Sequence, residues 1–312
     1  MNPLILHHYP VSPFAEKVRA MLGFKGVAWK SVRIPMMMPK PDVVALTGGY
    51  RRTPILQIGA DVYCDTSLIA RVLERVVPAP TLFPYGERLE NRAMSHFADS
   101  VLFNITVPVG FQPGGMMKVF HPEMTAETLA EFGKDRAAMR QGGTVRRGPL
   151  SECRASMALL LPGIEAQLAS RPFLLGASAS ECDFALYHVL WPVWNVPATR
   201  PLLEPYPQTM AFLDRMSKFG ATEGAELSSE EALRVAKKSR PAAIKHPEAF
   251  EADGIALGDR VQVMPVDYGF DPVKGELMQC SPAEVAVRRS DPRAGTVVVH
   301  FPRFGYQVSR AD

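Results

Sequence analysis

The chain has 312 residues, of which 47% are hydrophobic and 21% charged, and its net charge at pH 7 is +3. This length and composition are those of an ordinary globular chain that buries one large core or two to three smaller ones. No apolar run approaches the ~20 residues that span a bilayer, and the N-terminus lacks the basic and apolar stretches of a signal peptide. We therefore expect a cytoplasmic protein with no membrane partner.

The positive charge is unevenly distributed along the chain. Lys and Arg outnumber Asp and Glu by ten to five in residues 1–80, equal them at eighteen each in residues 81–250, and fall behind by seven to nine in residues 251–312. A basic first segment suits a small anionic substrate, although a solvated surface has the same composition. The acidic balance of the last segment argues against nucleic acid as a partner, because phosphate binding needs a basic surface.

Cysteine and histidine spacing gives no sign of a metal site. The adjacent residues His7 and His8 lie on a predicted strand and point to opposite faces, so they do not chelate one ion together. The cysteines form no C-x-x-C pair, and we expect reduced, mostly buried thiols. They stand alone at Cys64, Cys153, Cys182 and Cys280.

The first 50 residues predict a strand, a helix, a second strand and a short helical turn. The strand at residues 4–9 breaks at Pro10, and Ser12-Pro13 then gives a helix start with proline at the first helical position. Ser12 is the predicted N-cap. The second strand spans residues 28–34, and the helical turn spans residues 43–46.

Residues 52–74 predict a strand, a tight turn, another strand and a helix. Pro54 cannot donate to a central ladder, so the chain enters the strand at residues 55–58 from a turn. Residues 59–61 reverse the chain, and a helix begins at Asp65 or Thr66. The free N–H groups of that helix end attract an anion and Asp65 attracts an ammonium group, which together outline a clamp for an amino acid. The alternative is that Asp65 and Thr66 only cap the helix.

The predicted element order in residues 1–80 is that of a thioredoxin-like α/β layer without the C-x-x-C motif. A linker at residues 78–84 leads into a predicted helical bundle, residues 81–240. Apolar spacing predicts helices near residues 94–105, 157–168, 184–194 and 212–219, the second bent or broken at Pro162-Gly163. Capping boxes at Ser180/Asp183 and Ser228/Glu231 predict two helix starts, the latter opening a fifth bundle helix.

Residues 241–312 predict a linker followed by a small all-β domain. Alternating apolar residues separated by Gly and Pro predict five short strands, which suggests a loosely SH3-like barrel. We expect this part to dock on the bundle, support a dimer or act in regulation. The predicted strands span residues 260–265, 275–280, 284–289, 296–301 and 306–308.

Three features of residues 53–73 together resemble the glutathione-binding half of the glutathione S-transferase family. They are Thr53-Pro54 at a strand start, the Asp65-Thr66 pair one hairpin later, and the helix register from Ile69 to Leu73. The family's usual pair is Glu-Ser or Asp-Ser, so Thr66 is a departure that keeps the hydroxyl. The resemblance implies a cis bond before Pro54, a Thr53 backbone that pairs with the cysteinyl part of glutathione, and a γ-glutamyl end held by Asp65 and Thr66.

The segment from Ser12 to Arg19 also resembles the family's first active-site loop. The resemblance implies that the Ser12 hydroxyl, with the positive helix end at Pro13, favours the thiolate of bound glutathione. Tyr9 is the rival activator. Lys40 is a candidate partner for the glycine carboxylate of glutathione, although a loop lysine is usually only solvated.

The resemblance implies that the second substrate's apolar pocket combines the first active-site loop with the loop between the first two bundle helices. The alternative is that the apolar residues of that second loop simply pack the end of the bundle. The candidate pocket residues are Phe14, Phe111, Met116, Met117 and Phe120.

The resemblance implies a homodimeric detoxification enzyme that conjugates glutathione, as a substrate, to a small hydrophobic electrophile. The runner-up is a non-catalytic glutathione-binding or protein-interaction module, because fold does not fix function. A glutathione-dependent disulfide reductase would need a cysteine where Ser12 stands. The electrophile's identity does not follow from the sequence.

Overall fold

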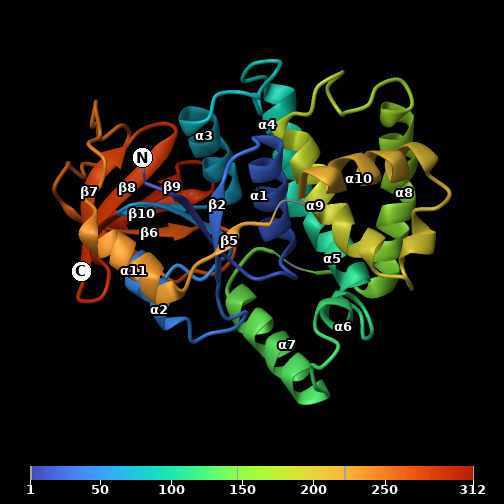
Figure 1. Ribbon diagram of the computed structural model, residues 1–312, viewed down its shortest axis with the longest axis horizontal. Coiled ribbons are helices and arrows are strands. Elements are labelled where there is room, and N and C mark those ends of the chain that lie inside the picture. Colours follow the sequence, from blue (N-terminus) through green and yellow to red (C-terminus); the bar gives the residue numbers. More distant parts are fainter. Residues whose placement is uncertain (1, 146, 221–222, 312) are drawn as a thin grey trace.

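The computed structural model describes residues 2–145, 147–220 and 223–311. Strands lie on one side and a group of helices on the other, with α1 and α3 between them (Figure 1). None of the helices within the described ranges is both long enough and apolar enough to cross a membrane.

The predicted thioredoxin-like order of strands and helices is confirmed in the first layer. β1 runs parallel to β2 and antiparallel to β3, and β3 returns as β4 through a turn in which Gly59 has φ 64°. A positive φ favours glycine at that turn. The elements are β1 (Leu4–His8), α1 (Pro13–Phe24), β2 (Trp29–Arg33), α2 (Pro41–Thr47), β3 (Ile55–Ile58), β4 (Asp61–Cys64) and α3 (Thr66–Val76).

The predicted helical part is also confirmed, and it is built around α9 (Glu181–Asn195), whose residues are nearly all buried. Its start carries the predicted capping box of Ser180 and Asp183. Around or beside it lie α4 (Leu89–Phe97), α5 (Phe103–Gly110), α6 (Met116–Phe120), α7 (Ala126–Arg140), α8 (Leu150–Leu168) and α10 (Pro207–Gly220), with a 3-10 turn at Arg200–Leu202.

Two helix predictions need correction. The single helix expected over residues 94–105 is interrupted by a π-helical segment, Ala98–Leu102, between α4 and α5. Of the bend or break expected at Pro162-Gly163, the break is absent, and α8 continues through Pro162. Ala158, whose carbonyl loses its helical partner to that proline, is exposed, so the lost hydrogen bond lies on the solvent-facing side of α8.

The helix opened by Ser228, α11 (Ser229–Lys238), has the predicted capping box but does not join the bundle. It packs against α2, β2 and β9, on the sheet side of the molecule. Its buried residues are small or apolar and belong to the core beneath the sheet, which explains this location. These residues are Ala232, Leu233 and Ala236.

All five predicted C-terminal strands are present, but the described strands do not close into an SH3-like barrel. They extend the first layer into one sheet, ordered β10-β6-β7-β8-β9-β4-β3-β1-β2-β5, where β5 is Ala225–Glu226. One edge of β9 pairs with β8 and the other runs parallel to β4, so β9 has no edge left to meet β10. The C-terminal strands are β6 (Arg260–Pro265), β7 (Val273–Cys280), β8 (Glu284–Asp291), β9 (Gly295–Pro302) and β10 (Tyr306–Arg310).

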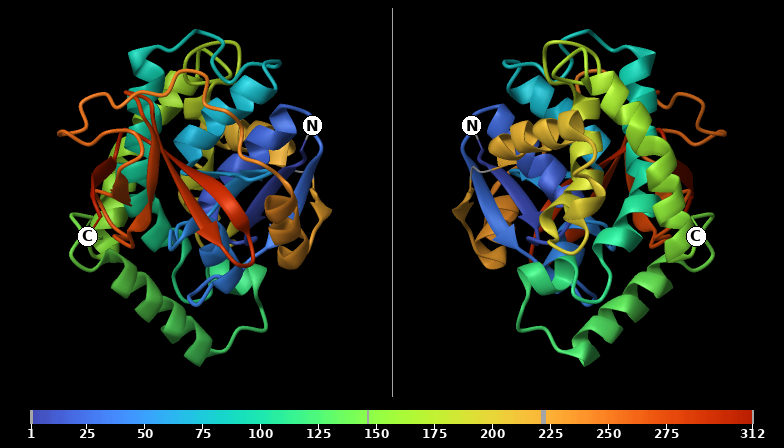
Figure 2. Two further views of the ribbon diagram at one scale, coloured as in Figure 1. Left: turned by 90° about the vertical axis from the view of Figure 1, so that its left-hand side faces the viewer. Right: turned by 90° about the vertical axis from the view of Figure 1, so that its right-hand side faces the viewer.

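The C-terminal strands lie beside the strands of the first layer (Figure 2), and one cluster of buried hydrophobic residues includes members of both strand groups. Val62 of β4 lies opposite Val299 of β9, and both are fully buried. Ile55 and Val285 belong to the same buried cluster. The C-terminal strands are therefore packed as part of the sheet that carries the predicted glutathione site.

Candidate functional site

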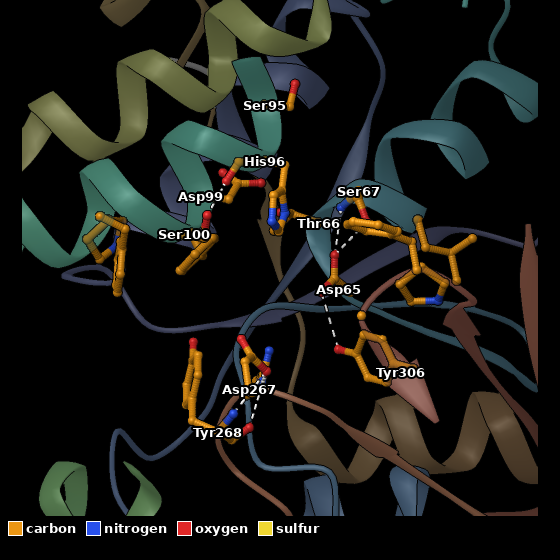
Figure 3. Close-up of a pocket in the computed structure, with 18 of the residues that line it drawn as sticks. Asp65, Thr66, Ser67, Ser95, His96, Asp99, Ser100, Asp267, Tyr268 and Tyr306 are labelled. Carbon is orange, nitrogen blue, oxygen red and sulfur yellow. Dashed lines mark hydrogen bonds and ion pairs between the residues drawn. The ribbon is translucent and has the colours of Figure 1, made fainter. Parts of the chain in front are cut away.

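A cavity of about 870 Å³ opens where the first layer, the helices and the C-terminal strands meet (Figure 3). Its walls come from α1, the start of α3, the α4–α5 region, α7, and the loops that precede β7 and β10. Eight of the predicted site residues line it. They are Tyr9, Ser12, Phe14, Thr53, Pro54, Asp65, Thr66 and, from the end of α5, Phe111.

Ser12 is the N-cap of α1, as predicted. Its Oγ accepts a hydrogen bond from the backbone N–H of Ala15 at 3.2 Å, and the residue is 4% exposed. The backbone N–H of Ser12 donates to the carbonyl of Tyr9 at 3.2 Å. The two hydroxyl-bearing residues thus share one turn at the positive end of a helix, where an anion such as a thiolate is stabilised.

The Thr53-Pro54 peptide bond is cis, in agreement with what the family resemblance implies. Pro54 is buried at the entry to β3, and Thr53 faces the cavity. The Thr53 side chain is held in place because its Oγ1 accepts a hydrogen bond from Lys40 Nζ at 3.2 Å.

Asp65 is the N-cap of α3 and has a positive φ of 76°. Its Oδ1 accepts hydrogen bonds from the backbone N–H of Ser67 at 2.9 Å and from Ser67 Oγ at 2.7 Å. Its Oδ2 accepts one from the hydroxyl of Tyr306 at 3.2 Å. Thr66, the first residue of α3, is 4% exposed and lies beside it at the cavity wall.

Lys40 is buried outside the cavity lining. Besides Thr53, its ammonium group contacts the carbonyl of Arg51 at 3.5 Å and lies 5.4 Å from the ring centre of Tyr9. Burial, with a further contribution from the charge of Arg136, lowers the pKa of Lys40 to about 7. Lys40 thus supports Thr53 and Tyr9 from behind, and its contact with a glycine carboxylate stays a prediction.

The second-substrate residues divide into two groups. Phe14 and Phe111 line the cavity, whereas Met116 and Met117 are buried in the helical core. Phe120 packs on Trp191 of α9 with ring centres 5.2 Å apart. The location of these three residues on α6 agrees with the alternative that they pack the end of the bundle.

The inner wall carries a buried ionic cluster that the sequence interpretation missed. Lys17 Nζ lies 2.8 Å from Asp99 Oδ2 and 2.9 Å from Glu181 Oε1, and His188 Nε2 lies 2.7 Å from Asp99 Oδ1. Burial alone would raise the pKa of Asp99, but Lys17 and His188 outweigh it and lower the pKa to about 2. Asp99 lies on the π-helical segment, so it is a fixed negative charge at the cavity wall.

Residues of the C-terminal part form another section of the cavity wall, which the sequence did not predict. The guanidinium of Arg52 stacks on the ring of Tyr268, with 3.9 Å to the ring centre, and forms an ion pair with Asp267. The hydroxyls of Tyr50 and Tyr306 lie 2.8 Å apart. Partners more than 200 residues apart leave no local sequence signal, whereas Ser67 was recognisable from its Asp-x-Ser spacing at a helix start.

Among the residues that the structure describes, no group of three or more His, Cys, Asp or Glu side chains is arranged to hold a metal ion. The four cysteines are free and buried. Burial raises the pKa of the Cys64 thiol and of the Cys182 thiol above their usual value, so neither is suited to act as a thiolate at neutral pH.

Comparison with known proteins agrees with this geometry. Residues 6–81 match the family model of the glutathione S-transferase N-terminal domain, and residues 149–215 match that of the C-terminal domain. The crystal structure of a GST-like protein from Pseudomonas syringae is 40% identical, covers 100% of both chains and has a TM-score of 0.83. A glutathione S-transferase from Rhodospirillum rubrum F11 shares the fold at 19% identity, over 70% of this chain and 92% of its own, with a TM-score of 0.52.

This chain is also similar to a protein that is not named as a glutathione S-transferase. FtsZ-localized protein A from Caulobacter vibrioides (strain NA1000 / CB15N) is 25% identical over 185 residues, which is 58% of this chain and 72% of that protein. The two domain matches and the full-length GST-like structure nevertheless agree with each other. The chain belongs to the glutathione S-transferase family.

Proposed function

We propose that the protein is a glutathione transferase that conjugates the glutathione thiolate to small hydrophobic electrophiles. The observation that carries the proposal is the shared cavity, in which Ser12 at the start of α1, Thr53 before cis-Pro54, and Asp65 at the start of α3 all form part of the wall. Each of these positions has a chemical match in glutathione.

Glutathione is held as a substrate at three points in this proposal. The Thr53 backbone pairs with the cysteinyl residue, as a strand pairs with a peptide ligand. Asp65 takes the γ-glutamyl ammonium group, and the N-terminus of α3 at Thr66 takes the carboxylate.

Ser12 acts on the sulfur itself. A free thiol has a pKa near 8.5, so only a small fraction is thiolate at pH 7. The Ser12 hydroxyl donates to the sulfur and the α1 dipole favours its negative charge, which together increase that fraction. The thiolate then forms a C–S bond with an electrophile bound against Phe14 and Phe111. Tyr9 is the rival donor.

A non-catalytic glutathione-binding or protein-interaction module is the second candidate, and one observation favours it. FtsZ-localized protein A, which is similar to this chain, is named for its localization with FtsZ.

The decisive experiment combines retention on immobilised glutathione with a conjugation assay on a broad panel of electrophiles. Retention with turnover supports the transferase. Retention without turnover on any electrophile supports the glutathione-binding module. Failure to bind glutathione contradicts the transferase and leaves the protein-interaction module. The proposal includes a homodimer located in the cytoplasm. Light scattering of the purified protein tests the dimer, and fractionation of cells tests the location.

A further inference from the structure

We propose that the electrophile taken by this cavity carries a negatively charged group, such as a carboxylate, which Arg147 binds with help from Arg140. This inference rests on the proposed transferase function and names its substrate class. Both arginines lie in the cavity wall.

A row of aromatic rings leads from the thiolate site to Arg147. Phe14, two residues after Ser12, packs on Phe103 with ring centres 4.6 Å apart. The guanidinium carbon of Arg147 lies 5.9 Å from the ring centre of Phe103. An aromatic electrophile placed on these rings therefore has its reacting carbon near Ser12 and its far end near a cation.

The positive charge at this end of the cavity is not neutralised within the described part of the chain. The other arginines of this wall have partners, since Arg136 contacts Asp135 at 3.6 Å and Arg52 pairs with Asp267. Arg140 and Arg147 form no ion pair with any described carboxylate. Partial desolvation and then the charge of Arg140 lower the pKa of Arg147 to about 10, so it stays protonated at neutral pH. Two such cations in one wall favour an anionic ligand.

The chain shortly before Arg147 is held in place at residues 143–144. The backbone N–H of Thr144 donates to the carbonyl of Asp267 at 3.1 Å, and that of Gly269 donates to the carbonyl of Met139 at 2.8 Å. A Cβ at Gly143 would lie 2.3 Å from the same Asp267 oxygen, so glycine permits this close approach. The loop between β6 and β7 thus holds the end of α7 and residues 143–144 at this side of the cavity.

A pair of matched enones tests the substrate class, para-carboxybenzylideneacetone and its methyl ester. In both, the glutathione sulfur bonds to the β-carbon, the alkene π electrons form an enolate, and the enolate takes up a proton from water to replace the one lost by the thiol. The two compounds differ in one charge at the far end of the ring. The Arg147→Gln variant should lose about ten- to hundredfold in kcat/KM with the acid and less than about twofold with the ester.

Three variants and a binding arm make this result specific. Arg147→Lys keeps a cation and should retain most of the preference for the acid, and Arg140→Gln should reduce it partially. Arg154→Gln removes one exposed charge on α8 outside the cavity, and it should leave kcat/KM unchanged with both the acid and the ester. Titration calorimetry with the saturated analogue, para-carboxybenzylacetone, measures the same discrimination without any reaction.

The outcomes separate this inference from the proposed function. If the wild type shows no turnover but binds the saturated acid through Arg147, the transferase fails and the anion site stands. Suppose instead that Arg147→Gln loses kcat/KM equally with the acid and the ester and has a raised KM for glutathione. Arg147 would then bind the glycine carboxylate of glutathione, and the inference would be overturned. Unchanged kinetics and binding of the acid in Arg147→Gln would overturn it as well.

Discussion

The Tyr306 hydroxyl donates a hydrogen bond to Asp65 Oδ2 at 3.2 Å, linking the last strand of the chain, β10, to the N-cap residue of α3. The same hydroxyl lies 2.8 Å from that of Tyr50. A carboxylate oxygen accepts more than one hydrogen bond, so Tyr306 and a ligand ammonium group can share Oδ2. Tyr306 then orients the carboxylate toward the cavity.

Asp65→Asn should weaken glutathione binding by about 1–3 kcal/mol, because a charged hydrogen bond to the ammonium group is lost. The fold should tolerate the change, since asparagine accepts the positive φ and keeps an oxygen for the N–H of Ser67. Titration calorimetry and thermal melting of the variant measure the two effects. Unchanged affinity would leave Asp65 as a helix cap only.

Tyr306→Phe serves as the companion variant. It removes the hydroxyl from Asp65 but leaves the carboxylate charge, so its effect on glutathione affinity should be smaller than that of Asp65→Asn. If affinity instead rises, Tyr306 competes with the ligand for Oδ2, and the non-catalytic candidate gains weight.

Val299→Ala tests whether the C-terminal strands unfold together with the first layer. Val299 is fully buried opposite Val62, and its truncation should lower the unfolding free energy by about 2 kcal/mol. The three tryptophans lie in β2 and α9, so their fluorescence reports only on the other parts of the chain. A denaturant midpoint that shifts in this signal demonstrates coupling across the β4–β9 pair.

Val308→Ala is the matched control, because Val308 is only partly buried on β10, at the far edge of the sheet. It should shift the midpoint much less. A tryptophan transition that is unaffected by Val299→Ala would mean that residues 241–312 unfold as an independent domain.

His300 should make stability depend on pH near neutrality. Burial alone would lower its pKa, but hydrogen bonds to Asp61 at 3.0 Å and Glu284 at 2.6 Å outweigh burial and raise the pKa above 6.5. Arg75, 3.9 Å from Glu284, is the other charge that faces this group. A raised pKa means that protonation favours the folded state, so this contribution is complete below pH 6.5 and is lost as pH rises through the folded pKa.

His300→Gln removes the titration but keeps a hydrogen-bond donor. The difference in unfolding free energy between wild type and variant should therefore shrink as pH rises above 6.5, measured by denaturant titration across neutral pH. The exposed His246→Gln variant should show no such trend. A difference that stays constant with pH would mean that His300 does not change charge on unfolding in this range.

The features that the sequence predicted are local ones. Ser12 before Pro13, Asp65 before α3 and the five C-terminal strands are each defined by residues within one turn or one strand, where capping and alternation apply. The pairing of β9 with β4 joins residues more than 200 positions apart. The alternation of apolar and polar residues predicts a strand but does not predict which other strand pairs with it. The Lys17–Asp99–His188 cluster was missed for the same reason, since its members look like ordinary helix residues in the sequence.

Ser12→Asn distinguishes the capping role of Ser12 from its activating role. Asparagine is a good N-cap, so the variant should melt near the wild type, whereas Ser12→Ala loses the cap at a cost of about 1 kcal/mol.

If the Ser12 hydroxyl stabilises the thiolate, the apparent pKa of bound glutathione should rise toward the free-thiol value in Ser12→Asn. The pH dependence of kcat/KM with a chromogenic electrophile measures that pKa, and each unit corresponds to about 1.4 kcal/mol of lost preference for the thiolate. Tyr9→Phe is the parallel variant, since Tyr9 lines the same end of the cavity. A pKa that rises in Tyr9→Phe and stays constant in Ser12→Asn would make Tyr9 the activator.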